Sequence, residues 1–256
     1  MSSSEISFGT DGWRAVIAEE YTFDNLQRVA AATGRWLLGR PREETAVPPS
    51  VVIGHDTRFL GPQFAERTAQ TLASLGVKVY LGDRFVPTPG VSGATVDLGC
   101  DAGIVITASH NPPSYSGFKI KTAYGGPAVP EQTDAIEAEL RAGGDELDDL
   151  VGVEELEADG LIERVDLRAR YRAMLADQID VEAIRASGIT LAYDPMYGAG
   201  QGILEELLSP ERVKTVHAEE NPGFGGTPPE PIGRHLDALS ELVRAEHCDL
   251  ALATDG

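Results

Sequence analysis

The sequence predicts an α/β protein of two consecutive three-layer α/β domains with mainly parallel, mixed sheets. Apolar strand-like runs alternate with helical periodicity along the whole chain, as in βαβ units. At roughly 150 residues per domain, 256 residues make about two domains. An acidic, glycine-bearing stretch at 142–159 separates two such halves. We therefore expect domains at 1–150 and 151–256, with a solvated segment inside one domain as the alternative interpretation of this stretch.

The first half follows a strand–helix order with clear stop signals. Gly76 directly follows one helical pattern and suits a helix C-terminus. A Pro-Thr-Pro turn precedes the next helical pattern. Apolar spacing predicts helices over 23–38, 64–75, 89–98 and 133–140. Short apolar runs predict strands, or for the last an extended loop, over 51–54, 77–81, 103–107 and 118–121.

The second half repeats this rhythm without a convincing residue-level repeat. Helices are predicted over 165–179, 202–208 and 236–245. Strands are predicted over 189–193, 213–216 and 250–253. The sequence stops one step beyond the last predicted strand, where ligand-binding loops of open α/β sheets begin. We expect it to be the first part of a longer chain.

Composition excludes several classes of protein. Twenty-one Lys and Arg against 41 Asp and Glu give a net charge of −20, which argues against nucleic acid and anionic membranes as partners. No apolar run reaches the ~20 residues of a membrane span. The N-terminus lacks a basic flank and an apolar core of a signal peptide. With only two cysteines, a disulfide framework is not expected. These features predict a cytoplasmic location.

The strongest local signal is Thr107-Ala-Ser-His-Asn-Pro-Pro113, directly after a predicted buried strand. The strand would deliver Ser109 to the carboxyl edge of the sheet, and the two prolines would stiffen the loop. A serine beside His110 is a candidate nucleophile with a proton acceptor or donor. A surface turn capped by serine and asparagine is the alternative.

Two further segments suggest an anion site. Lys119 and Lys121 are half of the four lysines, and at strand spacing they share one face. In so acidic a chain they favour a local anion site over solvated edge lysines. Near the start, Phe8-Gly-Thr-Asp-Gly-Trp-Arg14 combines a tight glycine turn with a guanidinium, whose planar donors suit phosphate. A hairpin with a surface arginine is the alternative there.

Three more segments carry weaker signals. Asp255 follows the last predicted strand and precedes a glycine, a common start for a divalent-cation loop, although one aspartate does not make a site. Segment 54–58 is interpreted as a strand-end turn with an internal Asp–Arg pair. The glycine-rich segment 197–202 has the wrong spacing for a dinucleotide loop and is interpreted as close helix–strand packing.

Taken together and in this order, these motifs resemble the α-D-phosphohexomutases, the phosphoglucomutase/phosphomannomutase family. The resemblance lies in Phe8–Arg14, Thr107–Pro112, Gly117-Phe-Lys119, Gly198-Ala-Gly200 and the final Asp255-Gly256, which looks like the opening of the family's D-G-D-x-D-R metal loop. It spans the whole chain.

The resemblance implies interconversion of hexose 1- and 6-phosphates through a phosphoserine at Ser109 and a hexose 1,6-bisphosphate, which also serves as activator. Mg²⁺ would bind Ser109 and three loop aspartates, of which Asp255 is the first. Arg14 and Lys119 would lie near the transferring phosphoryl group, and His110 would assist positioning or proton transfer. The resemblance also assigns Thr10, Asn111 and Lys121 to substrate or phosphate binding.

The family's remaining metal-loop residues and its third and fourth domains lie beyond this sequence. We therefore expect weak Mg²⁺ affinity and negligible mutase activity from the 256-residue chain. The substrate is a phosphosugar, with glucose slightly favoured. Two alternatives stay open: a serine-dependent hydrolase or phosphatase that uses Ser109 and His110, and a non-catalytic phosphosugar-binding fragment.

Overall fold

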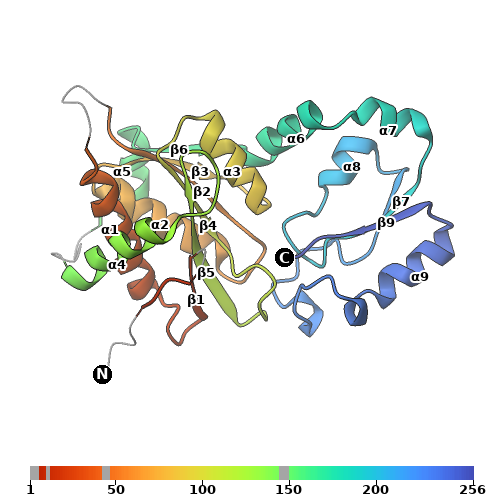
Figure 1. Ribbon diagram of the computed structural model, residues 1–256, viewed down its shortest axis with the longest axis horizontal. Helices are drawn as coiled ribbons and strands as arrows, with labels where there is room; N and C mark the ends of the chain where they lie inside the picture. The colour runs from red at the N-terminus through yellow and green to blue at the C-terminus, as the bar shows by residue number, and fades with distance from the viewer. Residues whose placement is uncertain (1–5, 10–11, 42–46, 144–149) are drawn as a thin grey trace.

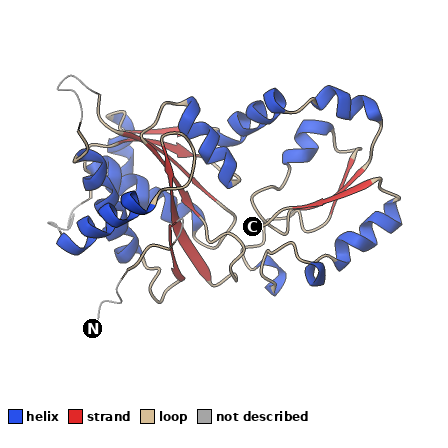
Figure 2. Ribbon diagram, viewed as in Figure 1, coloured by secondary structure: helices blue, strands red, loops and turns tan. Residues whose placement is uncertain are grey.

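The computed structural model describes residues 6–9, 12–41, 47–143 and 150–256. It contains two α/β/α units that lie side by side, with the C-terminal residue between them (Figure 1). In both units helices flank a central sheet (Figure 2). The predicted fold class is therefore confirmed.

The first sheet is mixed. Most neighbouring strands are parallel, but near one side of the sheet a single strand runs antiparallel to both of its neighbours. Its order is β1-β5-β4-β2-β3-β6. The strands β4, β2, β3 and β6 run parallel, whereas β5 is antiparallel to both β1 and β4. The six strands are β1 (Gly12–Val16), β2 (Ser50–His55), β3 (Lys78–Gly82), β4 (Ala102–Ile106), β5 (Tyr115–Thr122) and β6 (Ile162–Val165). The carboxyl ends of the parallel strands form the edge at which the candidate site lies.

Helices cover both faces of this sheet and produce two cores. On one face lie α1 (Phe23–Leu38), α2 (Gly61–Ser74), α4 (Pro130–Ala142) and α5 (Val153–Ala158). On the other lie α3 (Thr88–Asp97) and α6 (Leu167–Gln178). Strand alternation divides the side chains between the faces: Val51 and Ile53 pack in the first core, and Val52 in the second. Both faces of β2 are therefore buried, as parallel central strands require.

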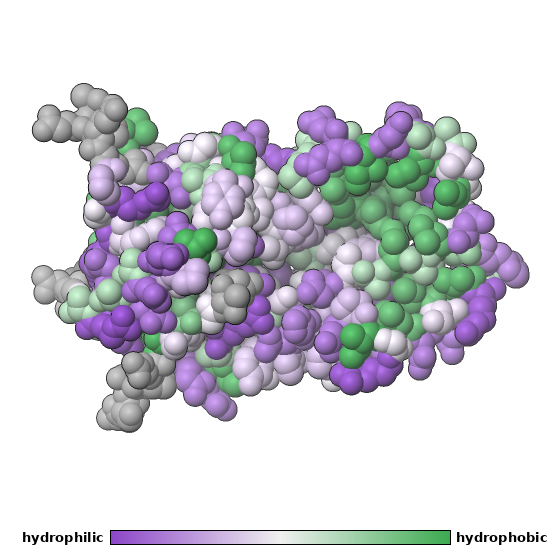
Figure 3. Space-filling model, in the orientation of Figure 1, coloured by the Kyte–Doolittle hydropathy of each residue, from purple (hydrophilic) through white to green (hydrophobic). Residues whose placement is uncertain are grey.

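The second sheet is smaller and entirely parallel, with the order β8-β7-β9. Its elements are α7 (Val181–Ser187), β7 (Leu191–Asp194), α8 (Ile203–Leu208), β8 (Val213–Thr215), α9 (Asp237–Glu246) and β9 (Leu250–Ala253). The central strand β7 is buried, but Leu250 and Leu252 of β9 are 50% and 39% exposed. Ile179 and Ile189 of the same unit are exposed as well. Apolar side chains gather on the visible face of the second unit (Figure 3).

Most elements predicted from periodicity are present within a few residues of their predicted bounds. Helix α1 begins at Phe23 as predicted, because the Thr22 hydroxyl accepts a hydrogen bond from the Asn25 amide and caps the first turn. Strands β1 and β6 and helices α5 and α7 were not predicted. Residues 144–149 of the acidic stretch lie outside the described part of the chain.

The expected domain division at residue 150 stays a prediction. Strand β6 lies beyond that residue, yet it pairs with β3 in the first sheet. The first sheet therefore includes a strand from beyond residue 150, and α6, which follows that strand, contacts α3 of the first unit and α8 of the second. None of the described helices has the length and apolar character that a bilayer crossing requires.

Candidate active site

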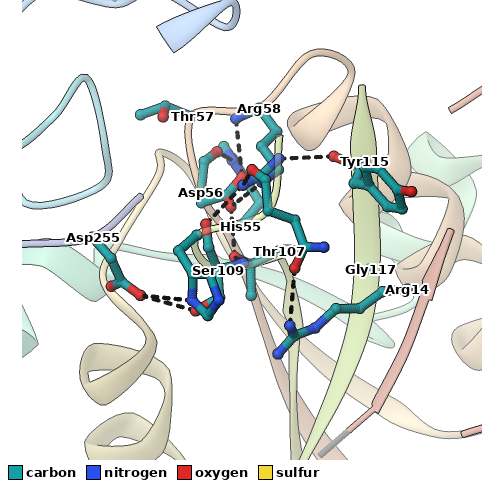
Figure 4. A network of polar contacts seen from close by, with 12 residues as sticks. Arg14, His55, Asp56, Thr57, Arg58, Thr107, Ser109, Tyr115, Gly117 and Asp255 are labelled. Atoms are coloured by element: carbon teal, nitrogen blue, oxygen red, sulfur yellow. Dashed lines mark hydrogen bonds and ion pairs between the residues drawn. The ribbon is translucent and has the colours of Figure 1, made fainter. Parts of the chain in front are cut away.

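The Ser109 turn follows β4 at the carboxyl edge of the first sheet (Figure 4). The Ser109 amide donates to Thr107 Oγ1 at 2.9 Å, and the Asn111 amide donates to the Ala108 carbonyl at 3.1 Å. Ser109 has a φ of 57°, in the left-handed region that residues other than glycine enter at a cost. The turn is therefore sharp and presents a half-exposed Ser109 side chain at the rim.

The second domain brings Asp255 to this serine. Asp255 follows β9, and the Ser109 hydroxyl donates to its Oδ2 at 2.9 Å. His110 Nδ1 lies 4.0 Å from the same oxygen, and both side chains are about half exposed. The structure thus joins three predicted residues from two domains. The arrangement gives the hydroxyl a carboxylate acceptor and a nearby imidazole.

The donors at this point suit Mg²⁺ in kind, but the described residues supply few of them. Ser109 Oγ and the Asp255 carboxylate are hard oxygen ligands, which Mg²⁺ prefers. Mg²⁺ takes about six ligands in octahedral geometry, and the described residues contain no group of three or more His, Cys, Asp or Glu arranged to hold a metal. Ser109 and Asp255 would therefore be two protein ligands of an ion that otherwise needs water or phosphate oxygens.

The predicted cations lie on one face of β1 and β5. In the antiparallel register Arg14 is opposite Gly117, and Gly12 is opposite Lys119; directly opposed residues share a face. Arg14 Nη1 donates to Asn111 Oδ1 at 3.0 Å, which joins this strand to the Ser109 turn. A Cβ on Gly117 would lie 2.5 Å from the Thr107 carbonyl oxygen and 3.0 Å from Arg14 Cγ, so only glycine permits this close approach.

Lys119 and Lys121 occupy successive positions on that same face, and both are buried. Lys119 is opposite Val105, near the end of β4, whereas Lys121 is opposite Gly103, two residues further from the rim. Lys119 is therefore the lysine nearer to the Ser109 edge. Thr10 lies outside the described residues.

Arg58 is part of the site that sequence reasoning underrated. The predicted internal pair is confirmed, because Arg58 Nε donates to Asp56 Oδ2 at 3.2 Å. The guanidinium also donates to the carbonyl oxygens of Ser109 and Asn111, each at 2.7 Å, and of Pro112 at 2.8 Å and Tyr115 at 3.0 Å. It is fully buried, and this burial lowers the pKa of Arg58. The run Asp56-Thr57-Arg58 after a strand was the only sequence signal.

Two loops of the second domain support the Asp255 segment. The Gly256 amide donates to the Pro229 carbonyl at 3.3 Å. A Cβ on Gly198 would lie 2.6 Å from Gly256 Cα and 2.8 Å from the Asp255 carbonyl oxygen. The glycine-rich segment 197–202 therefore packs against the Asp255 segment, in addition to leading into α8. Asp194, at the end of β7, is fully buried and lies 3.0 Å from His217 Nδ1.

We expect Gly198→Ala to displace Asp255 from Ser109, because the added methyl group meets backbone atoms that no side-chain rotation can move. Isothermal titration of Mg²⁺ into the purified variant should show weaker binding than into the wild-type chain. Gly233→Ala is the matched control in the same domain, since a Cβ there meets nothing within 4 Å. Equal Mg²⁺ binding by the Gly198 variant and the wild type would contradict this role.

The buried residue His55, which lies beside the site, makes the stability of the folded protein depend on pH. It is buried at the end of β2, with Nδ1 2.7 Å from the Asp56 carbonyl oxygen. Burial is the largest cause that lowers the pKa of His55 below its usual 6.5, and the nearby Asp56 opposes it. The folded state therefore prefers the neutral ring. The stability from this preference is complete above pH 6.5 and is lost as the pH falls from there toward the folded pKa.

We expect His55→Asn to reduce the loss of melting temperature between about pH 7.5 and 5.5, the range in which an ordinary histidine titrates. The asparagine amide can still donate to the Asp56 carbonyl, but it does not titrate. Thermal unfolding of both proteins across this range measures the difference. Equal pH dependence in the two proteins would show that His55 contributes nothing to it. His247→Asn, at an exposed position in the second domain, is the control.

Comparisons with known proteins match both domains. Residues 5–146 match the family model described as "Phosphoglucomutase/phosphomannomutase, alpha/beta/alpha domain I", and residues 169–256 match the model for domain II. A phosphoglucomutase/phosphomannomutase of Thermococcus kodakarensis is 32% identical over 97% of this chain and 53% of its own length. A phosphoglucosamine mutase of Deinococcus radiodurans is 34% identical, over 97% of this chain and 53% of its own length.

Solved structures agree with this result. A Thermus thermophilus protein, provisionally described as a phosphomannomutase, is 39% identical, with a TM-score of 0.86 over 99% of this chain and 55% of its own. A Burkholderia thailandensis phosphoglucomutase/phosphomannomutase family protein at 22% identity shares the fold, with a TM-score of 0.73 over 99% of this chain and 53% of its own. The chain thus spans about half the length of the relatives that it matches.

Proposed function

The chain belongs to the phosphoglucomutase/phosphomannomutase family, and from this premise we propose that it carries the phosphoserine of a hexose-phosphate mutase on Ser109. The proposal rests on one observation: a carboxylate and a strand face that bears two cationic side chains lie beside the same serine hydroxyl. Ser109 Oγ lies at an open rim, 2.9 Å from Asp255 Oδ2, beside the strand face that bears Arg14 and Lys119.

The proposed reaction moves one phosphoryl group out and another back. The bond between phosphorus and Ser109 Oγ breaks, while a bond forms between phosphorus and the free hydroxyl of a hexose monophosphate. The hydroxyl proton passes to a base, for which His110 is the candidate, and a proton returns to the released Ser109 oxygen. In the second transfer the Ser109 hydroxyl loses its proton and attacks the other phosphoryl group of the hexose 1,6-bisphosphate, and the released sugar oxygen takes up a proton. Because phosphoryl transfer depends mainly on positioning and charge neutralisation, a rigid turn and fixed cations suit it.

Charge supports the assignment of the cations. A phosphoserine carries roughly −1.5 to −2 charges at neutral pH, in a chain with a net charge of −20. Arg14, bonded to the turn through Asn111, and Lys119 on the same strand face supply positive charge locally. We assign Asn111, Lys121 and Thr10 to substrate or phosphate binding. When bound by Ser109 and Asp255, Mg²⁺ would neutralise further charge on the phosphoryl oxygens.

The experiment is single-turnover phosphorylation. The purified chain is incubated with glucose 1,6-bisphosphate and Mg²⁺, and intact-mass spectrometry with peptide mapping follows the modification. We expect one phosphoryl group on Ser109, slower or less complete when Mg²⁺ is chelated. No phosphate on Ser109 at millimolar donor would overturn the proposal. Glucosamine 1,6-bisphosphate is the second donor to compare, because relatives named as phosphoglucosamine mutases match equally well.

The proposed location is the cytoplasm. Steady-state conversion of glucose 1-phosphate by this chain should be negligible, because it spans about half of its relatives. A serine-dependent hydrolase predicts a different modification: a fluorophosphonate probe would label Ser109, and the bisphosphate would not. Binding of the bisphosphate without transfer would favour a non-catalytic phosphosugar-binding role.

A further inference from the structure

We infer that Asp56 and Arg58 are positioning residues, which fix the direction of the Ser109 hydroxyl and couple it to the placement of the second domain. This inference rests on the proposed function of Ser109. Neither residue touches Ser109 Oγ in the structure. Arg58 donates directly to the backbone that carries this atom, whereas Asp56 accepts from the Thr107 side chain, which in turn accepts the Ser109 amide (Figure 4).

Every nitrogen of the Arg58 guanidinium donates hydrogen bonds to Asp56 or to the backbone around Ser109. It has about five N–H groups in a fixed fork. Nε donates to Asp56, Nη1 to the carbonyl oxygens of Pro112 and Tyr115, and Nη2 to those of Ser109 and Asn111. All of these bonds except the one to Asp56 therefore end on the segment from Ser109, within the turn, to Tyr115, the first residue of β5. A lysine, with its donors on one atom, cannot reproduce this fork.

Asp56 holds the other side of the same turn. Its Oδ2 accepts a hydrogen bond from Thr107 Oγ1 at 2.5 Å, and Thr107 Oγ1 in turn accepts the Ser109 amide at 2.9 Å. The left-handed φ of Ser109 costs on the order of 1–3 kcal/mol unless its surroundings impose it. With the Ser109 carbonyl fixed to Arg58 and its amide to Thr107, both ends of this residue are constrained, and the hydroxyl extends toward Asp255.

The same tripeptide contacts the loops that support Asp255. Thr57 Oγ1 donates to the Tyr197 carbonyl at 2.7 Å, next to the Gly198 position that packs on the Asp255 segment. On the other side, the Phe224 ring of the second domain lies 5.0 Å from the Arg58 guanidinium carbon, within cation–π range. A shift of the second domain therefore acts on Arg58, and through it on the Ser109 turn.

The test is Arg58→Lys in the full 256-residue chain, with two readouts. In single-turnover phosphorylation by saturating glucose 1,6-bisphosphate, we expect the rate constant to fall about 10- to 100-fold, the scale of a misplaced reacting group. The half-saturating donor concentration should stay unchanged, because Arg58 is buried away from solvent. In hydrogen exchange, the amides of Ser109, Asn111 and Tyr115 should lose protection.

Arg67→Lys is the matched control, since Arg67 also lies over a phenylalanine ring, Phe23 at 5.3 Å, and donates to Gln27 instead of the turn. It should leave both readouts unchanged. Thr107→Val is a milder second variant, which removes the bond between Asp56 and the turn with Arg58 in place. It should slow transfer and increase exchange at Ser109.

A purely structural role for Arg58 would lower the fraction of active protein without changing the rate constant of the folded remainder. That result, or unchanged rate and exchange in both variants, overturns the inference. If the wild-type chain takes up no phosphate, the proposed function fails, and the exchange readout then decides the positioning role independently.

Discussion

Ser109→Ala is expected to abolish phosphate uptake from glucose 1,6-bisphosphate, reducing the phosphorylated fraction to background. The variant lacks the only atom proposed to accept the group, and its environment otherwise persists, since the Thr107, Arg58 and Asn111 bonds use the backbone of the turn. Intact-mass spectrometry measures the loss. Uptake at another residue in this variant would show that Ser109 is not the carrier.

Ser109→Gly separates the hydroxyl from the backbone strain. It should be as inactive as the alanine variant, yet about 1 kcal/mol more stable, because glycine adopts the left-handed region at φ 57° without the steric cost of a Cβ. Ser114→Ala controls for serine removal in the same loop, since Ser114 is exposed. It should leave uptake unchanged.

Asp56→Asn is expected to destabilise the first domain by about 3–5 kcal/mol, the usual cost of leaving one partner of a buried ion pair uncompensated. Arg58 is fully buried and Asp56 nearly so, at 0% and 3% side-chain exposure. The change also weakens the acceptor for the Thr107 hydroxyl and the Arg58 amide. Urea unfolding followed by tryptophan fluorescence reports on this domain, because Trp13 and Trp36 both lie in it.

The control for this prediction is Glu163→Gln. Glu163 pairs with Lys78 at 3.0 Å, but its side chain is 55% exposed, so losing the pair should cost no more than ~1 kcal/mol. A destabilisation by Asp56→Asn as small as that of Glu163→Gln would show that the Asp56–Arg58 pair does not stabilise the fold.

The order of strands and helices could be predicted because each long element carries its own periodicity. Helix α1 combines regular apolar spacing with a capping threonine at its start. Strand β6 was missed because its burial is uneven: Ile162 is buried, whereas the next two residues are exposed. Strand β1 was missed for another reason: its partner β5 is about a hundred residues distant, and the segment itself was interpreted as a tight glycine turn, with a hairpin as the alternative.

The site divides in the same way. Ser109 and His110 follow a predicted strand of the first sheet, and Asp255 follows one of the second, so each could be placed at the carboxyl edge of its own sheet. That these two edges meet was implied only by the family resemblance. The task of Arg58 could not, because it depends on four carbonyl groups more than fifty residues away. Every residue has a backbone carbonyl group, so the sequence does not indicate which of these groups accept a hydrogen bond from Arg58. The packing of Gly198 on the Asp255 segment was hidden for a similar reason: it is a contact between two loops.

The edge of strand β9 that pairs with no other described strand affects the tendency of this chain to self-associate. Within the described residues β9 pairs only with β7, and its leucines are exposed. Unpaired amide and carbonyl groups beside apolar side chains recruit further strands, which is how self-association begins. Concentrated samples will therefore tend toward assemblies joined at this strand, and light scattering against dilution should accompany any kinetic measurement. Leu252→Lys, which places a charge on this exposed strand, should reduce the self-association.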